Sequence, residues 1–518
     1  MNGAQALITT LVDNGVRVCF ANPGTSEMHF VAALDTVPDM RGVLTLFEGV
    51  ATGAADGYAR MTGLPAAVLL HLGPGLGNGL ANLHNARRAR VPMLVVIGDH
   101  ATYHKHYDAP LESDIDSVAA TVSGWVRRSM DPGDVAADAV EAIGFALAER
   151  RIATLILPAD VSWSEGSQLA APVAAGPESA PPDFSGVERA LRSGEPTVIL
   201  VGGDATRRSG LEAAARLAQR FGARLFCETF PARLERGAGI PAVERIAYFG
   251  EAAAAQLDGT RHLILAGAVS PVTFFGYPGK PSDLVPQGCT VHTLAGPVGA
   301  VAALSALAGS LAADTAAPAA PAGRPALPCG ELTVQTSAEV IGALLPEHAI
   351  VVDESNTSGF GLPQATNGAP AHDWLTLTGG AIGYGLPVAI GAAIAEPDRP
   401  VLCLESDGSA MYTISALWTH AREGLDITTV VYANHAYDIL RIELQRVGAQ
   451  TPDRPTGPKA ESLLDLSSPT MDFVGIAQGM GVPARRATTA EEFADALQWA
   501  FADTGPHLIE AVMPSIAG

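Results

Sequence analysis

The feature of this sequence that most constrains its fold is an alternation of short apolar runs with helix-like segments, repeated along the whole chain. The runs are VRVCFA, GVLTLF, AAVLLH, MLVVIG and TLILPA in residues 1–165, TVILVG, RLFCE and HLILAG in 186–308, and AIVVDE, VLCLES, ITTVVYA and LIEAVM in 331–518. They are rich in β-branched residues and have the length of strands. Strands that alternate with helices form doubly wound parallel sheets with helices on both faces, so the sequence predicts an α/β fold.

Two segments interrupt this alternation. Residues 166–185 and 309–330 are filled with Ala, Pro, Gly and Ser, a composition typical of linkers. A chain of 518 residues is long enough for about three domains of roughly 150 residues each. We therefore expect three α/β domains in series, with limits at 1–165, 186–308 and 331–518.

Composition and charge exclude several partners. The 32 basic and 54 acidic residues give a formal net charge of −22, which repels nucleic acid and anionic membrane surfaces. The uncharged stretch 284–313 is interrupted by Pro286 and Pro297, and the helix that follows is too short to cross a bilayer, so we expect a buried helix there. Five dispersed cysteines without a Cys-x-x-Cys pair, and an N-terminus unlike a signal peptide, indicate a cytoplasmic protein without disulfides.

Polar residues follow two runs of the last piece at the positions where strands would end. Asp407 ends one run, Gly408 makes a turn, a helix is expected to begin near Ser409, and Asn434 ends the next run. If these strands are neighbours, Asp407 and Asn434 face each other at the sheet edge where ligands bind. Their oxygens suit Mg²⁺, and the N–H groups at Ser409 suit an anion, which together describe a metal-bridged diphosphate. Each residue alone would be an ordinary turn former.

This layout resembles the thiamin diphosphate fingerprint, and the whole chain is similar to the decarboxylase and acetolactate synthase superfamily. SAMYTISALWTHA (409–421), FANPGTSE (20–27) and FEGVATGAADGYAR (47–60) most resemble benzoylformate decarboxylases. Two positions depart from the pattern: Ser406 stands where a Gly is usual, and Ala433 where many relatives have an Asn. The resemblance implies that Asp407, Asn434 and the carbonyl of Ala436 hold Mg²⁺. It places against the cofactor Glu48, Asn356, Gly380, Ile382, Asp407, Gly408, Ser409, Asn434 and Tyr437.

Glu48 is an isolated carboxylate that ends an apolar run and begins a helix of small residues. By itself it could cap that helix. The resemblance implies instead that it binds the cofactor pyrimidine, which can then accept the proton of the thiazolium C2. The matching glutamate of the family comes from the opposite subunit, which implies at least a homodimer, and tetramers are common among relatives. Ile382 matches the bulky residue that bends the cofactor, although an isoleucine is usually core.

His71 ends the run AAVLLH and precedes the glycine-rich segment GPGLGNG, where we expect a turn. This segment departs from a Rossmann fingerprint because Asn78 stands in place of the last Gly. A lone histidine is often structural, but the resemblance implies that His71 is the proton-handling histidine of the decarboxylases. Thr25 matches a family Ser that hydrogen-bonds substrate. A second family histidine is missing from the middle piece, where Phe274 and Phe275 make the predicted pocket more apolar.

Three histidines in HATYHKHY (100–107) could replace that proton donor. His100, His104 and His106 follow the run MLVVIG, and we interpret them as a solvated loop or pocket rim rather than a zinc site, since no further ligand is nearby.

The resemblance implies a thiamin diphosphate- and Mg²⁺-dependent decarboxylase of small 2-oxo acids, which acts through a covalent enamine that is protonated or captured by a second carbonyl. An acetolactate synthase-like carboligase is the alternative, with or without FAD in the middle domain. A non-catalytic nucleotide-binding regulatory α/β protein is an alternative of another class. The substrate side chain is left open.

Overall fold

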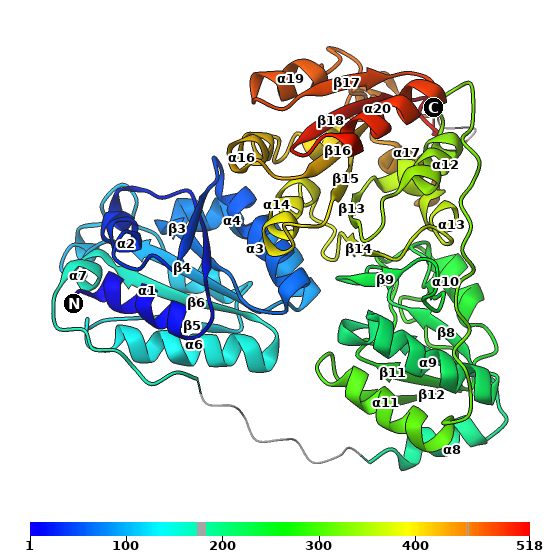
Figure 1. The fold of residues 1–518 in the computed structure, drawn as a ribbon, viewed down its shortest axis with the longest axis horizontal. Helices are drawn as coiled ribbons and strands as arrows, with labels where there is room; N and C mark the ends of the chain where they lie inside the picture. Colours follow the sequence, from blue (N-terminus) through cyan, green and yellow to red (C-terminus); the bar gives the residue numbers. More distant parts are fainter. Residues whose placement is uncertain (174–182, 452, 454, 518) are drawn as a thin grey trace.

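The computed structural model describes residues 1–173, 183–451, 453 and 455–517. The chain is an α/β protein whose three sheets follow one another in sequence, as predicted (Figure 1). Residues 312–330 of the proposed linker 309–330 run as an extended segment beside the second and third sheets, whereas residues 309–311 are the end of the preceding helix α11. Part of the other proposed linker, residues 174–182, lies outside the described residues. The predicted domain limits stay a prediction.

The first sheet has six parallel strands in the order β2-β1-β3-β4-β6-β5. Its central strands β3, β4 and β6 are almost completely buried, because helices cover both faces. The elements are α1 (Gly3–Asp13), β1 (Val18–Ala21), η1 (Thr25–Glu27), α2 (Met28–Leu34), β2 (Arg41–Leu44), α3 (Glu48–Thr62), β3 (Ala67–His71), α4 (Leu72–Ala89), β4 (Met93–Asp99), η2 (Lys105–Tyr107), α5 (Ile115–Ala120), β5 (Trp125–Arg128), α6 (Val135–Glu149), β6 (Ile152–Pro158) and α7 (Ala159–Trp163).

The second sheet has five parallel strands in the order β10-β8-β7-β11-β12. The helix expected in the uncharged stretch is α11, which buries one face against α9. Across the described ranges, the structure contains no helix with the length and apolar character that a bilayer crossing requires. The elements are α8 (Ser185–Arg192), β7 (Thr197–Val201), η3 (Gly203–Thr206), α9 (Arg208–Phe221), β8 (Arg224–Cys227), β9 (Leu234–Arg236), β10 (Glu244–Arg245), α10 (Gly250–Leu257), β11 (His262–Ala266), β12 (Thr290–Ala295) and α11 (Ala300–Leu311).

The third sheet has seven strands in the order β17-β18-β16-β15-β13-β14-β9. Six are parallel, and β9, which comes from the preceding piece of sequence, pairs antiparallel with β14 at one edge. The elements are α12 (Val334–Leu344), β13 (Ile350–Glu354), η4 (Asn356–Gly359), α13 (Leu362–Ala365), β14 (His372–Thr376), α14 (Gly385–Ala395), β15 (Val401–Ser406), α15 (Asp407–Ala410), α16 (Ala416–Glu423), β16 (Ile427–Ala433), α17 (Asp438–Arg446), α18 (Pro458–Glu461), α19 (Phe473–Gly479), β17 (Ala484–Ala487), α20 (Ala490–Ala502) and β18 (His507–Val512).

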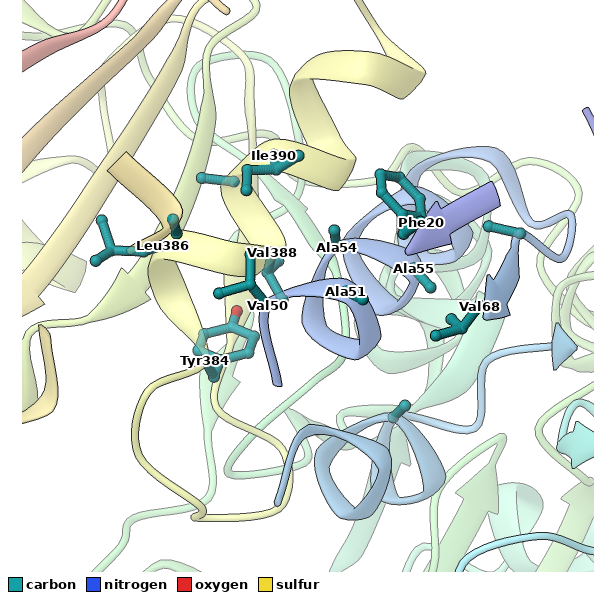
Figure 2. Close-up of a cluster of buried hydrophobic side chains, with 14 of the residues drawn as sticks. Phe20, Val50, Ala51, Ala54, Ala55, Val68, Tyr384, Leu386, Val388 and Ile390 are labelled. Atoms are coloured by element: carbon teal, nitrogen blue, oxygen red, sulfur yellow. The ribbon is translucent and has the colours of Figure 1, made fainter. Parts of the chain in front are cut away.

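The first and third sheets share one hydrophobic core, because α3 packs directly on α14. Figure 2 shows Val50 and Ala54 of α3 beside Val388 of α14. Glycines allow this close approach: a methyl group at Gly57 would lie 2.1 Å from the carbonyl oxygen of Val388. Small residues therefore bring α3, the helix that begins with Glu48, into direct contact with α14.

A buried ion pair fixes the same contact. Arg60 of α3 is 1% exposed and donates two hydrogen bonds to Asp56, one turn earlier. Its remaining Nη1 hydrogens reach the carbonyl oxygens of Thr376, at 2.7 Å, and Ala232, at 3.1 Å. One guanidinium thus joins α3 to β14 of the third sheet and to the segment between β8 and β9, and its donors are satisfied without water.

Candidate cofactor site

The metal end of the predicted site lies where β15 and β16 end side by side. The two strands are parallel neighbours, as the prediction required, with Ser406 opposite Tyr432. The Asp407 carboxylate accepts hydrogen bonds from the backbone N–H groups of Gly408, at 2.8 Å, and His435, at 2.7 Å. Burial raises the pKa of Asp407, and these N–H donors oppose the rise. The structure thus brings Asp407 against the loop that contains Asn434.

The side-chain amide of Asn434 is held at both ends. Its Nδ2 donates to Asp438 Oδ2 at 3.0 Å, and its Oδ1 accepts from the backbone N–H of Ala436 at 3.2 Å. The loop itself is fixed from outside, since the N–H of Tyr437 donates to the carbonyl of Leu464. The oxygens of Asp407, Asn434 and Ala436 make a donor set of the hard type that Mg²⁺ prefers, so the residues present fit the expected ion.

The segment expected to begin a helix near Ser409 differs in detail. The chain makes one helical turn, α15, and the longer helix α16 begins only at Ala416. Gly408 is needed in this turn, because a methyl group there would lie 2.4 Å from the ring of Tyr437. The turn therefore brings together Gly408, Ser409 and Tyr437, three of the predicted cofactor residues.

A pair of buried glutamates supports this turn, and sequence reasoning missed it. Glu354 accepts hydrogen bonds from three consecutive backbone N–H groups that begin at Gly383, and Glu405 accepts from Leu386 N–H and Ser409 Oγ. Burial raises the pKa of Glu354 to about 7, and burial together with the Glu354 charge raises that of Glu405 well above its ordinary value. The sequence did contain a signal for this pair, because Glu354 and Glu405 both stand at the ends of apolar runs.

The loop that contains Gly380 and Ile382 lies between α4 and the aromatic residues of the middle piece. Asn85 donates to the carbonyl of Ala381 at 2.8 Å and accepts from its N–H. Gly380 has φ = 74°, a left-handed conformation that favours glycine. A methyl group at Gly380 would come 2.7 Å from the ring of Phe274. Ile382 is half-buried.

Phe274 belongs to a cluster of aromatic side chains next to this loop. Its ring contacts Phe230, Tyr248 and Phe275 at centroid separations of 5.9, 5.3 and 4.8 Å. Phe274 and Phe275 remain 42% and 53% exposed in the single chain. The middle piece therefore presents an apolar wall beside the loop expected to hold the cofactor, as the sequence indicated.

Glu48 begins α3 and is only 7% exposed. Its Oε2 accepts a hydrogen bond from Asn78 Nδ2 at 2.9 Å. The glycine-rich turn expected at 73–79 is wrong, because these residues form the first turns of α4. The helical geometry gives Asn78 its reach to Glu48, and it places Gly75 against both Glu48 and His71.

His71 is paired with a buried carboxylate that sequence reasoning did not assign. Its Nδ1 lies 2.9 Å from Glu27 Oε2, which also accepts the N–H of Gly24 at 2.8 Å. Glu27 is 3% exposed, and its other oxygen is buried without a partner. Burial raises the pKa of Glu27, while the neighbouring imidazole lowers it in part. Thr25 lies two residues earlier on η1 and is exposed in the single chain.

The three histidines after β4 lie on a loop and on η2, as predicted. The centroids of the His100 and His104 rings are 5.4 Å apart, and His104 and His106 each contact the Tyr107 ring, all with tilted ring planes. Within the part of the chain that the structure describes, no cluster of three or more His, Cys, Asp or Glu side chains could hold a metal. The five cysteines are free thiols.

The chain is closely packed around Gly202, where β7 of the middle sheet ends. A methyl group at Gly202, just after β7, would lie 2.7 Å from the Glu228 carboxylate and 2.8 Å from the Cα of Ala268. Burial raises the pKa of Glu228. A buried carboxylate thus lies at the strand ends where sheets of this kind bind a dinucleotide, and its negative charge would not favour the diphosphate of FAD at this position.

Comparisons with known proteins agree with this geometry. Residues 1–120 match the N-terminal TPP binding domain of thiamine pyrophosphate enzymes, and residues 356–511 match the C-terminal TPP binding domain. Thiamine pyrophosphate is another name for thiamin diphosphate. The chain is 30% identical to "Benzoylformate decarboxylase" of Pseudomonas aeruginosa over 97% of both chains. The chain therefore belongs to the thiamine pyrophosphate enzyme family.

Within that family, three further proteins are similar to this chain. The chain is 73% identical over 518 residues, all of both proteins, to "Putative acetolactate synthase large subunit IlvX" of Mycobacterium tuberculosis. Its fold matches a 4-hydroxybenzoylformate decarboxylase of Rhodococcus jostii RHA1, with a TM-score of 0.85, 24% identity and 100% of both chains covered. It also matches the benzoylformate decarboxylase of Polynucleobacter necessarius, with a TM-score of 0.82, 21% identity and 99% of both chains covered.

Proposed function

We propose that this chain is a thiamin diphosphate- and Mg²⁺-dependent decarboxylase of 2-oxo acids. The observation that carries the proposal is the His71–Glu27 pair, which holds an imidazole at the end of β3 beside Glu48, across Gly75. A histidine that is partnered by a buried carboxylate has the chemistry of a proton donor and acceptor near neutral pH. Decarboxylation of a 2-oxo acid to an aldehyde consumes one proton, which such a histidine can supply.

Each residue of the site has a task in this proposal. The oxygens of Asp407, Asn434 and Ala436 would hold Mg²⁺ against a diphosphate, and Glu48 would share a proton with a ring nitrogen of the pyrimidine. When bound, thiamin diphosphate supplies the carbon nucleophile and the electron sink for the carbon–carbon bond cleavage. Thr25 would donate a hydrogen bond to the substrate carboxylate.

His71 would deliver the proton that replaces CO₂, and Glu27 would keep its Nδ1 hydrogen-bonded so that Nε2 carries the exchange. The aromatic wall around Phe274 would exclude water from the reacting carbon. Low water content would strengthen the hydrogen bonds to the reacting groups.

An acetolactate synthase-like carboligase is the second candidate. Two observations favour it: the relative that shares 73% identity carries that name, and Phe274 and Phe275 occupy the segment expected to hold a second proton donor. In that reaction a second carbonyl compound, rather than a proton, would take the place of CO₂.

Product analysis separates the two candidates. The purified protein, supplied with thiamin diphosphate and Mg²⁺, is incubated with a panel of aliphatic and aromatic 2-oxo acids, and CO₂, aldehyde and 2-hydroxyketone products are quantified. We expect aldehyde to match CO₂, and His71→Ala to lower aldehyde formation by about 10²–10⁴-fold. Glu27→Gln should give a smaller loss with a shifted pH profile. Products that are mainly 2-hydroxyketones would refute the release of an aldehyde as the main reaction and favour ligation. Full turnover of the His71→Ala variant would do the same.

The same proposal includes a homodimer, and a tetramer built from two such dimers. If Glu48 and Asp407 of one site come from different subunits, Glu48→Gln and Asp407→Ala chains co-expressed in one cell would form mixed dimers with one intact site. The mixture should then recover about one quarter of the wild-type activity, although each variant alone is inactive. If the mixture recovers no activity although analytical ultracentrifugation shows dimers, Glu48 and Asp407 of one site belong to the same chain.

A further inference from the structure

The C-terminal tail of the chain lies against the predicted metal loop. β18 runs parallel to β16, with Val512 opposite Ala433, so the residues that follow the two strands leave the sheet at the same edge. The N–H of Met513 still bonds to the carbonyl of Ala433 at 3.2 Å. The loop 434–438 and the tail 513–517 are therefore neighbours by strand register.

Asp438 joins these two segments. It is 2% exposed, and its carboxylate accepts hydrogen bonds from Asn434 Nδ2 at 3.0 Å, from Ser515 Oγ at 2.5 Å and from the N–H of Ile516 at 2.9 Å. The nearest cation is more distant, since Arg441 Nη1 lies 3.9 Å from Asp438 Oδ1. A buried carboxylate with three short hydrogen bonds and a distant cation is held mainly by these bonds.

The orientation of the Asn434 amide depends on this contact. An asparagine offers its oxygen or its NH₂ group in nearly the same space, and only its partners decide which end faces a ligand. Because Asp438 accepts from Nδ2, the Asn434 oxygen is turned to the other side, where the N–H of Ala436 also meets it. An amide turned the other way would present NH₂ to a cation and could not bind it.

We propose that Asp438 is a positioning residue for the metal site and that the tail residues Ser515 and Ile516 latch it in place, so that Mg²⁺ affinity depends on the last residues of the chain. The proposal rests on the proposed function, because it takes Asn434 as a ligand of the Mg²⁺ that binds with thiamin diphosphate. Residues that hold a metal ligand from behind typically change metal affinity by about 10–100-fold when removed.

The test measures Mg²⁺ affinity rather than turnover. The full-length protein is titrated with Mg²⁺ at saturating thiamin diphosphate while tryptophan fluorescence reports binding, and the thermal midpoint of each metal-free variant is measured alongside. We expect Asp438→Ala to weaken Mg²⁺ binding about 10–100-fold, and Ser515→Ala by about three- to tenfold, because Ile516 N–H still holds the carboxylate. A chain that ends at Pro514 should resemble Asp438→Ala.

Asp438→Asn separates orientation from charge. An asparagine can keep its oxygen towards Asn434 and Ile516 and turn its NH₂ to Ser515 Oγ, which can accept a hydrogen bond. Orientation therefore predicts near wild-type Mg²⁺ affinity for Asp438→Asn, whereas a purely electrostatic role at the start of α17 predicts the same loss as in Asp438→Ala. Asp472→Asn is the matched control and should leave Mg²⁺ affinity unchanged. Asp472 also precedes a helix, but it accepts its hydrogen bonds from Gly475 and Arg486 and not from the metal loop.

The outcomes are distinguishable. A wild-type protein that binds neither thiamin diphosphate nor Mg²⁺ would refute the proposed function. A wild-type protein that binds both, with Asp438→Ala and the shortened chain binding Mg²⁺ equally well, would refute the latch alone. Loss of Mg²⁺ affinity in Asp438→Asn as large as in Asp438→Ala would refute the orientation argument.

Discussion

Replacement of Gly391 by alanine tests the packing that positions Glu48. Gly391 lies in α14 where this helix is closest to α3: a methyl group would come 1.8 Å from the carbonyl oxygen of Ala54 and 2.4 Å from the backbone nitrogen of Tyr58. Ordinary contacts of this kind begin at 3.4 Å, so the helices would have to separate by roughly 1.5 Å. Both opposing atoms belong to the backbone, so no change of rotamer can make room.

The expected cost follows from two opposing effects. Overpacking of a tight core costs about 1–3 kcal/mol, and a separation of this size also weakens dispersion contacts along the two helices. Alanine gains about 1 kcal/mol over glycine in a helix. Because Gly391→Ala meets backbone on the partner helix, we expect a net loss of about 2 kcal/mol in the free energy of unfolding and weaker binding of thiamin diphosphate.

Gly309 provides the matched control. It lies in α11, is exposed, and an added methyl group would meet nothing within 4 Å. Gly309→Ala should therefore stabilise its helix by about 1 kcal/mol. The assay is urea unfolding followed by circular dichroism, with the midpoints of each transition compared, since a chain of this size does not unfold in one step. If Gly391→Ala raised the free energy of unfolding as much as Gly309→Ala does, α14 would not touch α3 in solution.

Three further predictions concern buried groups. Arg60→Met should cost about 3–5 kcal/mol in urea unfolding, because it leaves the Asp56 carboxylate buried without its partner; a loss below 1 kcal/mol would contradict the buried pairing. Burial raises the pKa of Glu354 to about 7, so the folded chain holds a proton that the unfolded chain releases near pH 4.5. The free energy of unfolding should therefore fall as pH rises from about 4.5 to 7. Glu405→Gln should reduce this slope, since the raised pKa of Glu405 adds to it, and a pH-independent wild-type midpoint would refute the coupling. In the native protein a thiol reagent should react fast only with the exposed Cys329, and rapid modification of all five thiols would contradict the fold.

The sequence predicted most strands that are buried on both faces. It missed most strands at sheet edges, with the exception of β2, which ends the first sheet. β3, β4 and β15 are almost continuous apolar runs because helices cover them on both sides. β5 and β17 contain two arginines each and lie at sheet edges, where one side needs no apolar residue. A polar edge strand has no periodic signal that separates it from a loop.

A strand that is fully buried can still be missed in the sequence. β14 was also missed, although it is fully buried, because His372 and Asp373 break its apolar pattern. The Asp373 carboxylate is paired with Arg233 and Arg399. This pairing across three distant segments makes the buried charge tolerable, and no local pattern in the sequence shows it.

The candidate site divides in the same way. Asp407 and Asn434 could be brought together from the sequence because they end consecutive strands of one sheet. The pairs His71–Glu27 and Asp438–Ser515 could not, because each depends on which strands are neighbours and on their register. Both pairs contain a carboxylate that local pattern assigns to a turn or a helix start.

Ser406 stands where the family usually has a glycine, and the structure explains why the turn tolerates this difference. Ser406 has φ = −96° and ψ = 153°, an extended conformation that any residue adopts, so the glycine usual at this position is not required by the backbone. Gly408 is different, because a methyl group there would strike the ring of Tyr437. The Ser406 hydroxyl accepts from Asn356 Nδ2 at 2.6 Å and lies 2.7 Å from Ser409 Oγ. It therefore joins the ends of β13 and β15 beneath the turn that is expected to hold the diphosphate, so this substitution adds a support without altering the turn.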